Sequence, residues 1–382
     1  MTQIVRFATV GARGYARTLL AYMRMLVDKG RGQLVAATIR NKASRPNIVA
    51  RFEADGVQVF DSYEAMLAAC QGKVDVVVLP TAIHHHAPMS IAALEGGYHV
   101  LVEKPAAARL TDVDRMIAAR EASGKQCAVG FQLIYSPVIQ ALKRTIGEGK
   151  LGRVKRIRTI ALWPRGPVYY ERNNWAGKLF CDGQPVYDSP FNNALAHHIM
   201  NMLYLAFPGR GRAAYAAQVE AELFRTYDIE SFDTGCLRVR TDSDVEVVFA
   251  ASHACDTLID PVMQLEAERA AVYCQLDERA TITYTDGTTE TIEQEDPREQ
   301  MFHNVIEAVT GTASEPLCTL EIARAHVACI EAMHQVAPIV TIPPSFVSQT
   351  TEGQRVIVGV AEAVQQVFAD GQLFSEIGAP FV

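Results

Sequence analysis

A glycine-bearing turn near the N-terminus has the residue types that bind phosphate groups. An apolar run over residues 4–10 is followed by Gly11 and Gly14, and a helix-like stretch begins at Tyr15. Such a turn lets backbone amides and a helix N-terminus approach a pyrophosphate. The dinucleotide fingerprint expects glycine where Arg13 stands, and Gly14 is out of step by one position. We expect Gly11, Arg13, Gly14 and Tyr15 to contact a dinucleotide; the alternative is a plain surface turn.

The end of the second apolar run bears on which dinucleotide is bound. NAD-binding domains usually place an acidic residue there, on the ribose hydroxyls, but residues 38–42 contain no carboxylate. Its absence removes a repulsion against a 2′-phosphate, and Arg40 or Lys42 could supply a charge-assisted contact. We therefore expect NADP or NAD as the cofactor and favour NADP. Either cation could equally be a solvated loop residue.

Residues 169–178 are dense in hydrogen-bond donors, acceptors and aromatic rings. A polyhydroxylated ring offers hydroxyls and apolar CH faces, and such a set of side chains suits both. We expect Arg172, Asn173 and Trp175 to bind a carbohydrate-like substrate. The alternative is an ordered loop in which Trp175 packs on a sheet.

Three consecutive histidines, residues 84–86, raise the question of a metal site. Three adjacent residues cannot all face one ion in regular backbone, and no carboxylate is suitably placed nearby. The eight cysteines are scattered without any Cys-x-x-Cys pair, which indicates buried free thiols. We expect no metal.

Composition limits the partners. The 382 residues are 49% hydrophobic, more than one core usually holds, so two domains are expected. The net charge of -7 and the lack of a Lys/Arg block argue against nucleic acid and anionic membranes. No apolar run approaches membrane-spanning length, and the opening residues lack signal-peptide features. A cytoplasmic protein with small-molecule partners is expected.

The first third of the chain alternates short β-branched runs with helical stretches. This alternation predicts consecutive βαβ units and hence a Rossmann domain, a doubly wound parallel sheet, over residues 1–125. It also favours the phosphate-binding interpretation of the first turn. The predicted strands are residues 4–10, 34–39, 57–60, 74–79 and 99–102, and the predicted helices are 15–29, 45–55, 62–69 and 88–96.

The rest of the chain predicts a different architecture. After a helix over residues 111–123, strands follow one another with only turns between, which predicts antiparallel pairing. Asp286 and Gly287 predict a hairpin turn. Residues 126–382 should therefore form an α+β domain with a mostly antiparallel open sheet, for substrate binding and oligomerisation. The predicted strands are residues 154–162, 217–224, 234–240, 245–253, 271–274 and 280–284, and the helices are 298–310, 321–337 and a C-terminal 352–369.

The run Glu103, Lys104 and Pro105 at the end of the fifth predicted strand resembles the signature of the Gfo/Idh/MocA family of sugar and polyol dehydrogenases. Thr81 and His86 resemble part of that family's Thr-Pro-Asn-x-x-His loop, although its proline and asparagine are replaced here. The resemblance runs through nearly the whole chain. Further along the chain, a set of residues resembles the start of that family's second domain: Gly130, Phe131, Gln132, Ser136, Pro137 and residues 149–152.

The resemblance implies roles for these residues. The family lysine that matches Lys104 lies near the nicotinamide and the reacting carbon, so Lys104 is implied to be catalytic and cofactor-binding. An ammonium in a partly desolvated cleft loses its proton more easily, or stabilises an alkoxide as hydride leaves. Glu103, Thr81 and His86 are implied to lie at the cofactor.

The family's second chemical element is an Asp-x-x-x-His pattern on a helix, whose histidine exchanges the hydroxyl proton. Here Asn193 and His197 are four residues apart, so they would share a helix face, and His197 is the predicted acid/base. His198 is the rival, because it precedes Asn201 by three residues, a spacing the family also shows. Asn193 can orient an imidazole but cannot stabilise imidazolium as a carboxylate does. Proton transfer would then be less efficient or fall more to Lys104.

Taken together, the resemblance implies an NAD(P)-dependent dehydrogenase or reductase acting on CH–OH groups. It would transfer a hydride between NAD(P) and a secondary alcohol or hemiacetal carbon of a sugar, polyol or related small molecule. The alternatives are a non-catalytic NAD(P)-sensing regulator of the same fold and a cofactor-retaining glycosidase. A homo-oligomer, dimer or tetramer, is expected, because the second sheet resembles one that pairs with another subunit in this family.

Overall fold

The computed structural model describes residues 3–276 and 278–382, which form two compact units. The first unit extends to Tyr135 and also contains Asp296–Ala323, and the second comprises Ser136–Glu295 and Arg324–Val382. The sequence alone suggests a single boundary after residue 125. The chain instead returns to the first unit, where helix α9 (Pro297–Thr310) packs on the first strand and the first helix.

Within the described residues, the first unit is built on a six-stranded parallel sheet in the order β3-β2-β1-β4-β5-β6. Strands β1 and β4 flank the point where the strand order reverses, the usual ligand position of such sheets. The doubly wound parallel sheet is confirmed. Strand β6 was not predicted, because three residues are too few to show a period. The strands are β1 (Val5–Val10), β2 (Gly32–Thr38), β3 (Gln58–Phe60), β4 (Val76–Leu79), β5 (His99–Val102) and β6 (Cys127–Val129).

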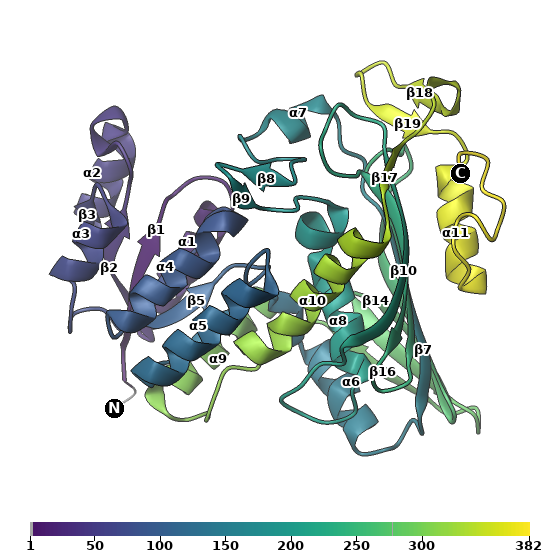
Figure 1. Ribbon diagram of the computed structural model, residues 1–382. Helices are drawn as coiled ribbons and strands as arrows, with labels where there is room; N and C mark the ends of the chain where they lie inside the picture. The colour runs from purple at the N-terminus through teal and green to yellow at the C-terminus, as the bar shows by residue number, and fades with distance from the viewer. Residues whose placement is uncertain (1–2, 277) are drawn as a thin grey trace. The chain divides into compact units, whose positions relative to one another are not determined.

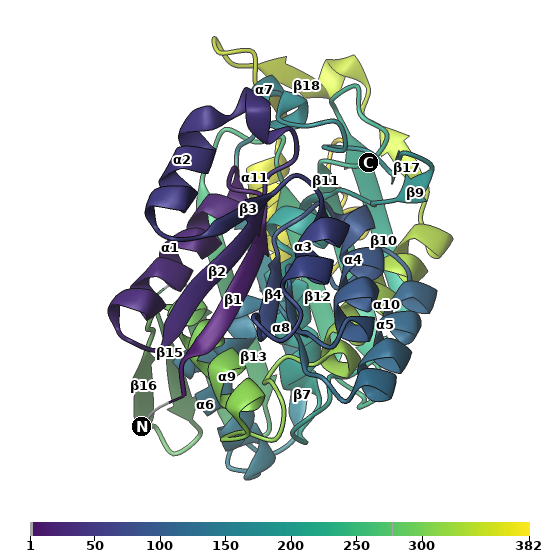
Figure 2. The same cartoon turned by 90° about the vertical axis from the view of Figure 1, so that its left-hand side faces the viewer.

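Helices cover both faces of this sheet. Figure 2 shows α1 and α2 on one side of β1 and β2, with α4 and α5 on the other side of the sheet. Helix α4 begins at Ile83 and not at the predicted Pro88, so the three consecutive histidines lie in its first turns. Helix α3 begins after Ser62, whose hydroxyl accepts a hydrogen bond from the Ala65 amide. The helices are α1 (Tyr15–Asp28), α2 (Pro46–Ala54), α3 (Tyr63–Ala69), α4 (Ile83–Glu95) and α5 (Leu110–Ser123).

The described residues of the second unit form a nine-stranded mixed sheet in the order β16-β15-β14-β13-β7-β12-β11-β10-β17. Most neighbours are antiparallel, as predicted, but β12 runs parallel to β7 and β17 runs parallel to β10. The hairpin at Asp286 and Gly287 is confirmed between β15 and β16. The strands are β7 (Val154–Leu162), β10 (Ala216–Arg225), β11 (Thr234–Thr241), β12 (Glu246–Ser252), β13 (Ile259–Ala267), β14 (Ala270–Gln275), β15 (Arg279–Tyr284), β16 (Thr289–Glu293) and β17 (Ile339–Thr341).

Shorter elements and helices complete the second unit. The predicted last helix over residues 352–369 begins only at Val360, because Arg355–Ile357 is a strand, β19, that pairs with β18. None of the described helices is long and apolar enough to span a membrane. All eight cysteines are buried free thiols, as predicted. The remaining elements are α6 (Pro137–Gly147), α7 (Pro167–Glu171), β8 (Phe180–Cys181), β9 (Gln184–Pro185), α8 (Ala196–Ala206), α10 (Leu320–Val336), β18 (Val347–Gln349) and α11 (Val360–Asp370).

Helices α8 and α11 cover opposite faces of the nine-stranded sheet (Figure 1). Side chains alternate between the two faces of a strand. On the α11 face, Ile160 and Val248 join Val364 and Val367 in one apolar cluster. Phe374, just beyond α11, completes that cluster and is fully buried. The C-terminal segment is therefore part of the core of the second unit.

Lys143 on α6 closes the C-terminal end of α8. Its ammonium donates to the carbonyl oxygens of Tyr204 at 2.5 Å and Phe207 at 2.6 Å. The last carbonyls of a helix have no partner within the helix and carry its negative dipole end, so a cation there is stabilising. Lys143 thereby fixes the helix that carries the candidate histidines His197 and His198.

We predict that Phe374→Ala destabilises the second unit. The ring lies 5.3 Å from the Phe381 ring and 6.3 Å from the Phe224 ring, measured between centroids. Removing a buried phenylalanine costs about 3–5 kcal/mol of unfolding free energy. Urea unfolding followed by tryptophan fluorescence measures the loss, because Trp163 and Trp175 both lie in the second unit.

The matched control is Phe180→Ala, since that side chain is 47% exposed. It should change the unfolding free energy by about 1 kcal/mol or less. Equal losses in the two variants would contradict a structural role for the C-terminal segment.

Candidate functional site

The glycine turn of the first unit has the geometry of a phosphate cradle. Gly11 and Gly14 have φ angles of 79° and 57°, and a Cβ atom on either would meet nothing within 4 Å. Helix α1 has no side-chain cap and no acidic residue in its first turn. Its first amides and the positive end of its dipole therefore face open space beside the reversal point of the sheet, which fits a pyrophosphate.

Other residues at this sheet edge also fit a bound dinucleotide. Thr81 follows β4, and its Oγ1 is buried without a hydrogen-bond partner among the described residues. An orphaned polar atom of this kind is costly unless a ligand or water satisfies it. Arg13 is exposed on the turn. The predicted cofactor residues Gly11, Arg13, Gly14 and Thr81 thus lie at the carboxyl edge of one parallel sheet.

The sequence predicts no carboxylate at the end of β2, but the structure brings one there. Ile39 is buried where an acidic residue is usual, but the carboxylate of Asp61 arrives from the end of β3. Asp61 lies 3.4 Å from the Lys42 ammonium and accepts a hydrogen bond from the Lys42 amide. The charge of Lys42 is therefore compensated. Arg40 is exposed and forms no ion pair with the described residues, so it is the cation best able to bind a 2′-phosphate.

Glu103 and Lys104 end β5 at the same sheet edge. The Glu103 carboxyl is buried and accepts a hydrogen bond from the Lys104 amide at 3.2 Å. Burial raises the pKa of Glu103 to about 7, against the opposing effect of the Lys104 charge. A Cβ atom at Gly130 would lie 2.7 Å from Glu103 Oε1, so only glycine fits beside this carboxyl.

His86 positions the Lys104 segment. Its Nδ1 lies 2.7 Å from the Pro105 carbonyl oxygen and its Nε2 lies 3.0 Å from the Thr81 carbonyl oxygen. Burial lowers the pKa of His86 to about 4, so the ring is neutral at neutral pH. A neutral imidazole carries one N–H, so the ring donates a hydrogen bond to one of these two carbonyl oxygens and lies against the other. The side chain therefore lies between the segments that follow β4 and β5, at the sheet edge where the cofactor is predicted.

Arg298 is a residue of this edge that the sequence did not reveal. It lies on α9, and its Nε donates to the Tyr15 hydroxyl at 3.0 Å. Burial raises the pKa of Tyr15, so the phenol stays protonated. The positive charge of Arg298 also acts on Glu103. Tyr15 and Arg298 are 283 residues apart, and no local motif links them.

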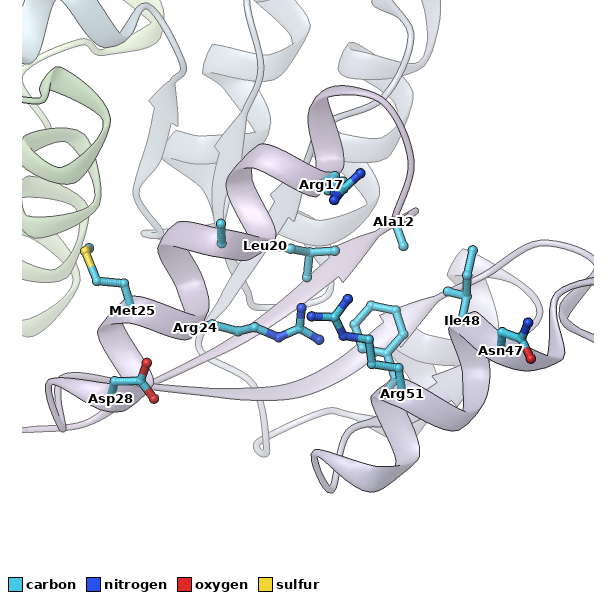
Figure 3. Close-up of a pocket in the computed structure, with 11 residues that line it drawn as sticks. Ala12, Arg17, Leu20, Arg24, Met25, Asp28, Asn47, Ile48 and Arg51 are labelled. Atoms are coloured by element: carbon cyan, nitrogen blue, oxygen red, sulfur yellow. The ribbon is translucent and has the colours of Figure 1, made fainter.

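A groove of about 620 Å³ between α1 and α2 begins at Ala12, beside the glycine turn. Figure 3 shows the side chains of Arg24 and Arg51 pointing toward one another across it. Arg24 is paired with Asp55 at 2.7 Å. The groove is positively charged with an apolar floor that includes Leu20, and it extends the electropositive surface of the cofactor edge.

In the second unit, a polar cluster gathers where two parallel strands end. The Trp163 amide donates to the Ser252 carbonyl, and the Arg165 amide donates to the His253 carbonyl, each at 3.0 Å. The loops after β7 and β12 therefore run side by side. Sequence reasoning missed Arg165 and His253, because it could not show that these two strands are neighbours.

Arginine and aromatic side chains alternate in this cluster. The Arg172 guanidinium lies 3.8 Å from the centroid of the Tyr169 ring and 5.4 Å from that of the Trp175 ring. Asn173 uses its side-chain oxygen within the loop, where it accepts hydrogen bonds from the Trp175 and Ala176 amides. Of the three predicted substrate residues, Arg172 and Trp175 lie together, while Asn173 mainly shapes the turn.

Asp188 supplies the carboxylate that the sequence pattern seemed to lack. Its Oδ1 accepts a hydrogen bond from Asn193 Nδ2 at 2.7 Å, and its Oδ2 accepts one from the Gly177 amide at 2.6 Å. Arg172 lies 3.5 Å from the same carboxylate. Asp188 was overlooked because helical spacing was assumed. Residues Pro190–Ala194 instead form one turn of π-helix, η3, a feature frequent at functional sites.

The two candidate histidines lie in the first turn of α8. His197 and His198 are both buried. Asn193 belongs to the π-turn and His197 to α8, with a break at Leu195, so the single helix face predicted for them is interrupted. Burial holds both imidazoles at the N-terminal end of α8. The geometry does not choose between them.

The N-terminal segment is similar to a known family. Residues 5–131 match a family described as oxidoreductases with an NAD-binding Rossmann fold, GFO_IDH_MocA. A 1-carboxy-3-chloro-3,4-dihydroxycyclohexa-1,5-diene dehydrogenase from Comamonas testosteroni is 32% identical over 152 residues, 40% of this chain and 37% of the relative. A dTDP-3,4-didehydro-2,6-dideoxy-alpha-D-glucose 3-reductase from Streptomyces violaceoruber is 28% identical over 156 residues, 41% of this chain and 44% of the relative. The chain thus matches about two fifths of the length of each.

The likeness of the fold extends further. The WlbA dehydrogenase from Bordetella pertussis, solved in complex with NADH and UDP-GlcNAcA, has a TM-score of 0.71 to this chain at 24% sequence identity. The match covers 87% of this chain and 96% of that chain. At this identity, the likeness shows a shared fold.

We predict that acid destabilises the second unit through His253. The ring is buried, and its Nδ1 lies 2.9 Å from the Trp163 carbonyl oxygen. Burial, reinforced by the charge of Arg165, lowers the pKa of His253 to about 3 from an ordinary 6.5. Its contribution to stability is complete above about pH 6.5 and is lost as pH falls toward 3. Between those values, each pH unit costs at most about 1.4 kcal/mol.

His253→Asn keeps a donor for the Trp163 carbonyl but does not titrate. Urea unfolding at pH 7, 6 and 5, followed by tryptophan fluorescence, should show a shallower pH dependence for this variant than for the native chain. His303→Asn, a change in the first unit, serves as the control and should leave the slope unchanged. Identical slopes for His253→Asn and the native protein would refute the assignment.

Proposed function

Residues 5–131 belong to the Gfo/Idh/MocA oxidoreductase family, and from this premise we propose that the whole chain is an NAD(P)-dependent dehydrogenase or reductase acting on CH–OH groups. Its substrate would be a sugar, a polyol or a related small molecule. The observation that carries the proposal is the placement of Lys104, half-buried at the end of β5 on the same sheet edge as the open glycine turn.

The proposed reaction transfers one hydride and one proton. In the oxidative direction, a secondary alcohol or hemiacetal loses a hydride from carbon and a proton from oxygen, and a carbonyl group forms. NAD(P)⁺, when bound, accepts the hydride. The proton passes to His197 or, where Lys104 is present as the neutral amine, to Lys104, and the group that accepted the proton then releases it to solvent.

The chain's own residues would hold the cofactor in a defined way. The amides of the glycine turn and of the α1 N-terminus bind the pyrophosphate, and Thr81 Oγ1 gains a partner. Tyr15, fixed by Arg298, lies at the same edge. Arg40 favours a 2′-phosphate, while the Asp61 carboxylate near Lys42 opposes it. NADP thus keeps a modest preference over NAD, which titration with NADPH and NADH measures.

Lys104 and the Asp188 network divide the proton chemistry. The Lys104 ammonium stabilises the developing alkoxide, and Glu103 beside it has a pKa near neutrality. In the second unit, the Asp188 carboxylate orients the Asn193 amide, so a negative charge lies one hydrogen bond away from that amide. The structure therefore places next to Asn193 the carboxylate that the sequence pattern lacks.

The polar and aromatic cluster of the second unit supports a sugar-like substrate. Tyr169 and Trp175 offer ring faces for CH groups, and Arg172 offers donors for hydroxyl groups. The similarity to a dTDP-sugar 3-reductase and to a dehydrogenase solved with UDP-GlcNAcA is consistent with this substrate class.

Replacing Lys104 should abolish turnover but not cofactor binding. Lys104→Met keeps the length of the side chain and removes its charge, so kcat/KM should fall by about a hundredfold or more. Formation of NAD(P)H is measured over a panel of sugars and polyols, and cofactor affinity is measured by NAD(P)H fluorescence.

Lys73→Met is the control, because Lys73 is exposed and bonds only to the Ala69 carbonyl oxygen among the contacts described. It should behave as the native protein does. Near-normal turnover by Lys104→Met would overturn the proposed function. Net accumulation of NAD(P)H also separates a dehydrogenase from a glycosidase that retains its cofactor.

A paired substitution decides between the two histidines. His197→Asn should lower kcat by about a hundredfold and remove one limb of the pH profile, because the general acid/base is lost. His198→Asn should keep most of kcat. The larger loss in His198→Asn would reverse the assignment.

A further inference from the structure

Arg165 is a half-buried cation whose charge is not compensated. Within residues 3–276 and 278–382 it forms no ion pair, and its Nε is buried without a hydrogen-bond partner. The hydrogen bonds described for its guanidinium are a 3.4 Å contact with the Pro164 carbonyl oxygen and one with the Tyr169 hydroxyl, and neither partner carries a negative charge. A partly desolvated guanidinium without a counter-charge is unfavourable, so the arrangement favours binding of an anion.

Two hydrogen bonds, one at the amide and one at the carbonyl, hold the backbone of Arg165 in place. Its amide donates to the His253 carbonyl at 3.0 Å, and its carbonyl accepts a hydrogen bond from the Tyr227 hydroxyl at 2.9 Å. The guanidinium lies 5.5 Å from the Trp163 ring centroid and 5.2 Å from the Tyr169 ring centroid. Aromatic rings on which a guanidinium rests limit its movement, which lowers the entropy lost when a ligand binds.

The acidic residues nearby are already committed. Asp188 accepts hydrogen bonds from Asn193 and Gly177 and pairs with Arg172. Asp233 is fully buried and accepts hydrogen bonds from the Thr226 amide, the Tyr227 amide and the hydroxyls of Thr226 and Thr234. Among the described residues, neither carboxylate therefore forms an ion pair with Arg165.

The neighbouring histidine, His253, is uncharged at neutral pH. His253 is buried, and burial together with the Arg165 charge lowers its pKa to about 3. His253 therefore supplies no counter-charge to Arg165. The same cluster contains the aromatic rings and donors that suit a hydroxylated ring.

We infer that the substrate of this site carries an oxyanion, a carboxylate or a phosphate, that pairs with Arg165. The inference rests on the proposed function and narrows its substrate class to acidic or phosphorylated sugars and their relatives. A planar guanidinium fork matches both groups in geometry, with two parallel N–H···O bonds. Arg165 is then a specificity-determining residue, and Arg172 remains tied to Asp188.

Matched probes that differ in charge test this inference. D-galacturonate is compared with its uncharged methyl ester, and galactose 1-phosphate with galactose, on the NAD(P)H-loaded protein by calorimetry and in turnover by kcat/KM. The native chain should bind one of the anions about 10- to 100-fold more tightly than its neutral counterpart, as expected of a charge-assisted pair. The anion that binds more tightly than its neutral counterpart shows whether the substrate carries a carboxylate or a phosphate.

Arg165→Gln should abolish that preference, and Arg165→Lys should restore part of it, because the charge returns without the fork. Arg240→Gln is the matched control, since Arg240 is paired with Asp244 on the surface, and it should keep the full preference. No preference for either anion in the native chain, or an undiminished preference in Arg165→Gln, would overturn the inference. Fluorescence titration with NAD(P)H and turnover of neutral sugars report separately on the proposed function, which survives if only the anion preference fails.

Discussion

The carboxyl ends of neighbouring parallel strands determine where chemistry can occur in this chain. In the first unit, β1, β4 and β5 end together and present the glycine turn, Thr81 and Lys104. In the second unit, the only long parallel pair, β7 and β12, brings Arg165 and His253 to one edge within the described residues. Parallel strands end on the same side, so loops that are far apart in sequence become neighbours there.

The residues at the sheet edge of the first unit could be predicted from the sequence more fully than those of the second unit, and the reason is physical. The glycine turn and the Lys104 run are local motifs, so their residues could be named from the sequence. Asp61 and Arg298 lie at the same edge only because of strand order and of a segment that returns late in the chain. In the second unit, Asp188 was hidden by a π-turn that breaks helical spacing. Periodicity predicted most of the long strands, but it missed β13 and β17 and could not supply strand neighbours.

One buried histidine in each unit is held in its neutral state by its surroundings. His86 and His253 are neutral because burial penalises their charged form, and each contacts a backbone carbonyl. The Asp188 side chain accepts hydrogen bonds from the Gly177 amide and from Asn193. At each of the two sheet edges, a neutral imidazole therefore lies beside charged side chains. That contrast directs attention to Lys104 in one unit and to Arg165 in the other.

The position of helix α11 limits how two copies of this chain could associate. A sheet face that pairs with another subunit must be free to receive it, but here the chain covers one face of β7, β10, β11 and β12 with its own C-terminal segment. A second copy could reach that part of the sheet only by exchange, with each α11 leaving its own sheet to lie on its neighbour's. Such a dimer would be domain-swapped, and it would bury no more apolar surface than two separate chains already do.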